Sequence, residues 1–130
     1  MPVKKRMNNI DSVCYENKST QDGGCFMTKR LIDLLGIRYP LLQGGMAWIS
    51  DAVLAAAVSN AGGAGIISTG GRTTEYTQAE IRRCRQLTDQ PFGVNVMLMA
   101  PNKEEILAVI CEERPAFVTL GAGNPVPYFK

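Results

Sequence analysis

The 130-residue chain carries 14 Lys and Arg residues against 12 Asp and Glu, a formal net charge of +2, and 45% of its residues are hydrophobic. This composition is typical of a globular domain. It argues against nucleic-acid binding, which needs basic residues gathered on one face. No apolar run reaches the roughly 18 residues of a membrane-spanning helix. The absence of histidine excludes histidine-activated nucleophiles and histidine metal ligands from this chain.

The four cysteines, Cys14, Cys25, Cys84 and Cys111, show no CxxC spacing, so the sequence predicts neither a zinc site nor a thioredoxin-type motif. Polar residues follow the basic residues 4–6 where a signal peptide would need an apolar segment. We therefore expect reduced thiols and a cytoplasmic protein without a bound metal.

Residues 1–26 are polar and aperiodic, which predicts a disordered extension. From Met27 onward helix-like and strand-like segments alternate. The charged residues of the later helices are expected on solvated faces: Arg82, Arg83, Arg85, Glu104, Glu105, Glu112 and Glu113. The predicted helices are 28–35, beginning at a Thr28 cap, then 52–60, 77–87 and 102–113, and the predicted strands are 39–43, 64–68, 92–98 and 116–120.

The predicted strands are nearly continuous apolar runs, as in parallel sheets that helices cover. Strands that alternate with helices predict a parallel α/β fold. The right-handed crossover rule leaves two closures, an open doubly wound sheet or a (β/α)8 barrel. A barrel needs about 250 residues, so this chain would form only half of one.

In both architectures ligands bind at the carboxyl ends of the strands. The loops that leave those ends are rich in glycine, which suits a flat ligand approached by the backbone. Asn95 interrupts an otherwise apolar strand, and its amide needs hydrogen-bond partners. Those partners are either a ligand or the neighbouring backbone, and the sequence leaves both open.

Four motifs follow one another along the chain: IRYPLLQGGMAW at 37–48, AGGAGII at 61–67, LTDQPFGVNVML at 87–98 and TLGAGNP at 119–125. In this order they resemble the start of the FMN-dependent nitronate monooxygenase family, and most closely its enoyl-[acyl-carrier-protein] reductase branch. The resemblance covers residues 27–130 and leaves residues 1–26 uncovered.

The resemblance implies that residues 27–130 are the N-terminal half of a flavin-binding (β/α)8 TIM barrel, with four parallel strands. It implies an oxidoreductase that passes hydride from NAD(P)H through FMN to an enoyl thioester in fatty-acid synthesis. The substrate would be linked to acyl-carrier protein or CoA, and the full-length enzyme would be a homodimer. The alternatives are FMN-dependent oxidation of alkyl nitronates, or an inactive truncated gene product.

By the same matching, Asn95 contacts the flavin, and backbone N–H groups of the preceding loop hydrogen-bond the edge of its ring. The family's catalytic histidine and its phosphate-binding loops lie downstream of this segment. The resemblance therefore implies no catalytic residue here and an inactive fragment. The implied cofactor-binding residues are Gly45, Met46, Ala47, Asn95, Gly121, Ala122 and Gly123.

Overall fold

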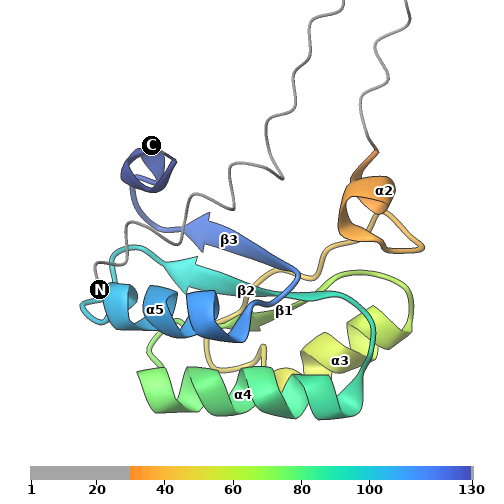
Figure 1. Cartoon of the computed structure of the whole chain (residues 1–130), viewed down its shortest axis with the longest axis horizontal. Coiled ribbons are helices and arrows are strands. Elements are labelled where there is room, and N and C mark those ends of the chain that lie inside the picture. Colours follow the sequence, from red (N-terminus) through yellow and green to blue (C-terminus); the bar gives the residue numbers. More distant parts are fainter. Residues whose placement is uncertain (1–29, 130) are drawn as a thin grey trace, which may run out of the picture.

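The structure is a computed structural model that describes residues 30–129 (Figure 1). Three parallel strands form one sheet in the order β1-β2-β3. Helices α3, α4 and α5 all lie against the same face of that sheet (Figure 1). This is the predicted parallel α/β architecture. In chain order the elements are α2 (Leu31–Leu35), α3 (Ala52–Asn60), β1 (Gly65–Ser68), α4 (Thr74–Leu87), β2 (Phe92–Met97), α5 (Lys103–Glu113), β3 (Phe117–Gly121) and the short 3-10 helix η3 (Val126–Tyr128).

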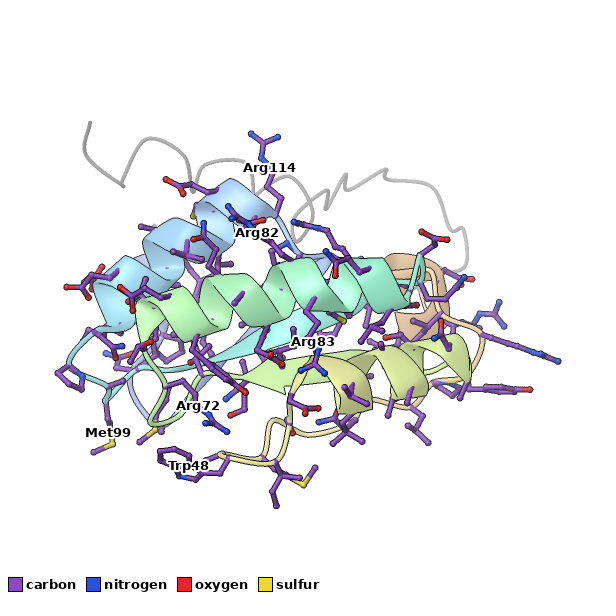
Figure 2. All side chains as sticks on the ribbon, turned by 90° about the horizontal axis from the view of Figure 1, so that it is seen from below. Trp48, Arg72, Arg82, Arg83, Met99 and Arg114 are labelled. Carbon is purple, nitrogen blue, oxygen red and sulfur yellow. The ribbon has the colours of Figure 1, made fainter. Side chains whose placement is uncertain are left out.

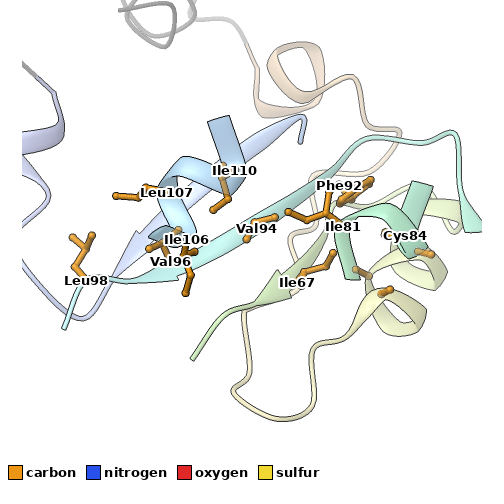
Figure 3. Close-up of a cluster of buried hydrophobic side chains, with 13 residues drawn as sticks. Ile67, Ile81, Cys84, Phe92, Val94, Val96, Leu98, Ile106, Leu107 and Ile110 are labelled. Atoms are coloured by element: carbon orange, nitrogen blue, oxygen red, sulfur yellow. The ribbon is translucent and has the colours of Figure 1, made fainter. Parts of the chain in front are cut away.

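The hydrophobic core lies between the sheet and its three helices (Figure 3). Alternate residues of the central strand, Val94 and Val96, are completely buried and belong to one cluster with Ile81 of α4 and Ile106 of α5. Burying each of these side chains contributes about 1.5–3 kcal/mol. Because side chains alternate along a strand, the intervening β2 residues point away from the helices.

The N-terminus of α3 is held by side chains on both sides of it. The carboxylate of Asp51 accepts a hydrogen bond from the backbone N–H of Leu54 (2.9 Å), as an N-cap should. The buried carboxylate of Glu80, on α4, accepts a second one from the N–H of Ala52 (2.6 Å). These bonds fix α3 against α4 and satisfy N–H groups that the helix itself leaves unpaired.

A second connection joins α4 to α5. The side chain of Glu113, only 9% exposed, accepts hydrogen bonds from the guanidinium groups of Arg82 (2.8 Å) and Arg85 (2.7 Å). It also accepts one from the Gln78 amide (3.1 Å). The expectation of a solvated helix face therefore holds for the exposed arginines and is wrong for Glu113, because the packing of the two helices covers this carboxylate.

The Glu113 cluster predicts a pH dependence of stability. Partial burial opposes ionisation of Glu113, but hydrogen bonds from Arg85, Arg82 and Gln78 outweigh it and lower the pKa of this carboxyl. A lowered folded-state pKa stabilises the fold above the ordinary carboxylate pKa, and this stabilisation is lost as the pH falls through the lowered value. We expect Glu113→Gln to lower the free energy of unfolding by roughly 1 kcal/mol at neutral pH, a modest loss because solvent screens the half-exposed arginines. The variant should also lose less of its unfolding free energy than wild type as the pH falls.

Urea unfolding of wild type and variant across the acid range measures this effect. Glu112→Gln is the matched control, because Glu112 is the exposed neighbour on the same helix. Equal acid sensitivity of wild type and Glu113→Gln would contradict the assignment.

The first predicted strand, 39–43, is wrong in extent: it forms a single parallel bridge between Leu42 and Ala64. The physical reason is the side chain of Gln43. Its Oε1 accepts from the N–H of Ile66 (3.1 Å), and its Nε2 donates to the Ile66 carbonyl (3.2 Å). A side-chain amide thus takes the place of backbone pairing along this edge of β1, and the sheet formed by residues 30–129 has three strands instead of four.

Two helix starts also differ from prediction. The first helix begins at Leu31, and the expected Thr28 cap lies outside the described residues. Helix α4 begins at Thr74, one turn earlier than predicted, because the Thr73 hydroxyl accepts from the N–H of Tyr76 (3.2 Å). The predicted extension, 1–26, likewise lies outside the described residues.

Two of the four cysteines, Cys84 and Cys111, lie in the described part of the chain, and Cys84 is a buried free thiol. Burial, reinforced by the charge of Glu80, raises the pKa of the Cys84 thiol to about 12, so this side chain is not a thiolate at neutral pH. Across residues 30–129 no cluster of acidic and cysteine side chains suits a metal ion. The helices in that range are too short or too polar to span a bilayer.

Candidate functional site

The candidate site lies where the strands end, on the sheet face that turns away from the helices. The strand register aligns Ser68, Asn95 and Thr119 in one row across β1, β2 and β3. Met97 and Gly121 form the next pair toward the carboxyl end. The row brings hydroxyl and amide groups together at the end of the sheet where α/β folds bind ligands.

Asn95 is held at both its backbone and its side chain. Its backbone carbonyl accepts from the N–H (3.2 Å) and the hydroxyl (2.9 Å) of Thr69. Its side-chain Oδ1 accepts from the hydroxyl of Thr119 (2.9 Å). Of the two possibilities that the sequence left open, neighbouring backbone does not satisfy this amide: a side chain on the next strand binds its oxygen.

The amino group of Asn95 points toward the loop that precedes α3. A Cβ built on Gly45 would lie 2.7 Å from the Cβ of Asn95 and 3.2 Å from its Nδ2. A Cβ on Gly121 would lie 3.5 Å from Oδ1. Three residues predicted from sequence, separated by up to 76 positions along the chain (121 − 45), therefore meet around one carboxamide. Glycine at 45 is required by this close approach and not by the turn alone.

The loop 44–49 is closed by the buried Ser50. The Ser50 hydroxyl accepts from the N–H of Met46 (2.8 Å), and the Ser50 N–H donates to the Met46 carbonyl (2.9 Å). The Met46 N–H is thus already bonded within the protein, and the predicted contact of Met46 with the ring stays a prediction. The N–H groups of Gly45 and Ala47 make no such bond within residues 30–129.

The third predicted segment, Gly121, Ala122 and Gly123, is shaped by Leu98. The Leu98 N–H donates to the Gly121 carbonyl (2.8 Å), and a Cβ on Gly123 would lie 2.6 Å from the Leu98 Cβ. Ala122 adopts φ 51°, a left-handed conformation that is uncommon outside glycine. Of the two glycines, Gly121 approaches Asn95 and Gly123 approaches Leu98, and the cofactor-binding roles of all three residues remain predictions.

Arg72 is a residue at this end that the sequence analysis did not identify. Its guanidinium lies 4.5 Å from the ring centroid of Trp48 and 4.4 Å from that of Tyr76, and it donates to the Trp48 carbonyl (3.1 Å). Figure 2 shows Trp48, Arg72 and Met99 at the same end of the molecule. Trp48 is 67% exposed and has φ 69°, so the arginine and Gly71 support a loop conformation that is costly by itself.

The side chains that meet around Asn95 are hydroxyls and amides, which do not titrate near neutral pH. They can orient a ligand and hydrogen-bond it, but they supply no proton donor or acceptor of matched pKa. A groove elsewhere lies at the opposite, amino-terminal end of β2 and β3. That groove is lined by Arg85, Thr88, Asp89, Gln90, Pro91, Phe92, Arg114, Pro115 and Ala116. Its residues are remote from the aligned row.

Comparison with known proteins places this arrangement in a family. The family model described as nitronate monooxygenase matches residues 28–128. The chain belongs to the nitronate monooxygenase family. A nitronate monooxygenase of Pseudomonas aeruginosa is 43% identical over 103 residues, which cover 77% of this chain and 29% of the relative.

Two solved structures share the fold. FabK from Thermotoga maritima superposes with a TM-score of 0.75 and 48% identity, over 78% of this chain and 32% of that one. The nitroalkane oxidase from Streptomyces ansochromogenes superposes with a TM-score of 0.66 and 27% identity, over 72% of this chain and 38% of that one. Both are TIM barrels, which confirms the predicted fold class. This chain spans about a third of the length of these relatives.

Proposed function

We propose that this chain is the N-terminal part of an FMN-dependent oxidoreductase and that its glycine loop and Asn95 contact the flavin ring. The observation that carries the proposal is the meeting of Gly45 with the accessible amino group of Asn95. Family membership supports it, because the proteins of this family are flavin-dependent.

The residues present suit a flat, polar-edged ring. Gly45 packs directly against Asn95, where an added Cβ would clash, and the backbone N–H groups of Gly45 and Ala47 make no bond within residues 30–129. Bound here, FMN would supply the hydride-accepting and hydride-donating centre, and the protein would supply its position and hydrogen bonds. Met46, Gly121, Ala122 and Gly123 would complete the surroundings of the ring.

For the reaction we favour enoyl-[acyl-carrier-protein] reduction with NAD(P)H as co-substrate. The 48% identity to FabK, an enoyl reductase, supports this choice. The enzyme would be a cytoplasmic homodimer acting on an enoyl thioester of acyl-carrier protein or CoA. The 130-residue chain alone would be inactive, because the family's histidine and phosphate loops are not among its residues.

The second candidate function is the oxidation of alkyl nitronates. The family model and the 43% identical relative from Pseudomonas aeruginosa favour it. The two reactions are separated with the native protein isolated from its source. NAD(P)H-dependent bleaching of the flavin, reversed by an enoyl thioester, would favour the reductase, whereas oxygen uptake with nitronate and no nicotinamide would favour the oxidase.

Flavin binding itself is tested by titrating FMN into the purified chain and following the quenching of flavin fluorescence. We expect binding at micromolar protein and at least tenfold weaker binding by Asn95→Asp, which replaces a donor by an acceptor of the same shape. Asn124→Asp is the matched control: Asn124 is exposed, and only its Oδ1 is used, by the N–H of Val126. No quenching, or equal affinities of the two variants, would contradict the proposal.

A further inference from the structure

Asn95, the middle residue of the row Ser68–Asn95–Thr119, accepts hydrogen bonds from two different threonine hydroxyls. Thr69, just past β1, binds the backbone carbonyl of Asn95, while Thr119, on β3, binds only its side chain. Both bonds are 2.9 Å long, and both donors are threonine hydroxyls. The two neighbouring strands thus hold different parts of Asn95, one its main chain and the other its carboxamide.

In the structure the Thr119 bond holds the oxygen end of the carboxamide and leaves its amino end on the ligand side. A hydroxyl has one proton, and Thr119 gives it to Oδ1 of Asn95. The carboxamide is planar, so its Nδ2 then points the other way, toward the position where Gly45 lacks a side chain. Nδ2 donates to no acceptor among residues 30–129, and no side-chain nitrogen or oxygen in that range is both buried and unbonded. The Nδ2 group is therefore accessible and has donor capacity left over.

We propose that Thr119 is a positioning residue, which fixes the orientation of the Asn95 carboxamide so that the site offers a donor. A ligand edge that meets the Asn95 amino group must then be a hydrogen-bond acceptor, such as a carbonyl oxygen or an unprotonated ring nitrogen. The inference deepens the proposed function and rests on it for the identity of the ligand. The orientation itself belongs to the free protein and exists before any ligand binds.

The first test therefore uses the ligand-free, 15N-labelled chain and the side-chain amide signal of Asn95, assigned by its loss in Asn95→Asp. We expect a heteronuclear NOE close to that of the strand backbone in wild type. Thr119→Val should lower it markedly, since the isosteric valine cannot donate, and Thr119→Ser should restore it. Thr69→Val is the matched control, because it deletes a buried threonine hydroxyl that binds the same residue only through its backbone.

An Asn95 amide that is as rigid in Thr119→Val as in wild type would overturn the proposal. So would a mobile amide in wild type, or equal loosening by Thr69→Val. Thr119→Ser keeps the test decisive if valine disturbs β3, because the serine hydroxyl keeps the donor.

The second test measures FMN binding of the same variants by fluorescence quenching. We expect Thr119→Val to bind FMN about tenfold more weakly than wild type, and Thr119→Ser and Thr69→Val to stay within about twofold. If the Asn95 amide is rigid and depends on Thr119 but the chain binds no FMN, the positioning role of Thr119 stands and the proposal that the ligand is FMN is refuted. If Thr119→Val binds FMN with wild-type affinity, the positioning role of Thr119 is refuted and the proposal that the ligand is FMN stands.

Discussion

Gly65→Ala is expected to prevent stable folding of this chain. A Cβ at this position would meet the backbone carbonyl oxygen of Ala55, where α3 lies directly on β1. Gly65 is buried in the sheet and paired with Phe92, and α3 is anchored at its start by Asp51 and Glu80. Neither backbone can move without breaking these bonds, so we expect a loss of about 3 kcal/mol or more.

The measurement is urea unfolding followed by circular dichroism, with Gly44→Ala as the matched control. A Cβ on Gly44 would meet nothing within 4 Å, so that variant should stay within about 0.5 kcal/mol of wild type. A Gly65→Ala protein with wild-type stability would mean that α3 does not rest on β1 as closely as the structure has it.

The small-residue contact at Gly65 also shows what the sequence could predict. Alanines along α3 and apolar runs along the strands indicated a helix packed closely on a parallel sheet, and the structure has it so. Patterns of this kind are local, because caps, periodicity and alternation depend on residues near one another in the chain. The helix ranges and strands β1 to β3 were therefore predictable to within a turn.

The first strand could not be predicted, because a tertiary bond decides it. Residues 39–43 carry the apolar pattern of a strand, yet the side-chain amide of Gln43 binds both backbone groups of Ile66. Nothing in the local sequence distinguishes a glutamine that ends a strand from one that replaces its pairing. The Arg72 contact with Trp48 and Tyr76 was not predicted for the same reason, since an arginine after two glycines carries no local pattern.

The site was partly predictable. Asn95 could be identified because a carboxamide inside an apolar strand needs a partner, whatever the fold. That its partner is Thr119 depends on the register of β2 against β3, which cannot be derived from the sequence pattern. The same limit applies to the bond between the Met46 N–H and Ser50, which no local pattern in the sequence predicts.

Gly45→Ala should separate the site from the stability of the fold. The added Cβ would lie 2.7 Å from the Cβ of Asn95, an atom fixed by the strand backbone, so the glycine loop must move. Unlike the surroundings of Gly65, residues 44–49 are exposed and can shift at a cost of roughly 1 kcal/mol. The shift moves the glycine loop and its unbonded N–H groups relative to Asn95.

We therefore expect Gly45→Ala to keep most of the unfolding free energy and to weaken FMN binding at least tenfold, because the donors are no longer placed around one ligand edge. Fluorescence quenching by the purified variant measures the affinity, and urea unfolding measures the stability of the same sample. Gly44→Ala, one residue earlier in the same loop and in open space, should change neither quantity. Wild-type FMN affinity in Gly45→Ala would show that the approach of this loop to Asn95 does not form the flavin site, because that approach cannot survive the added atom.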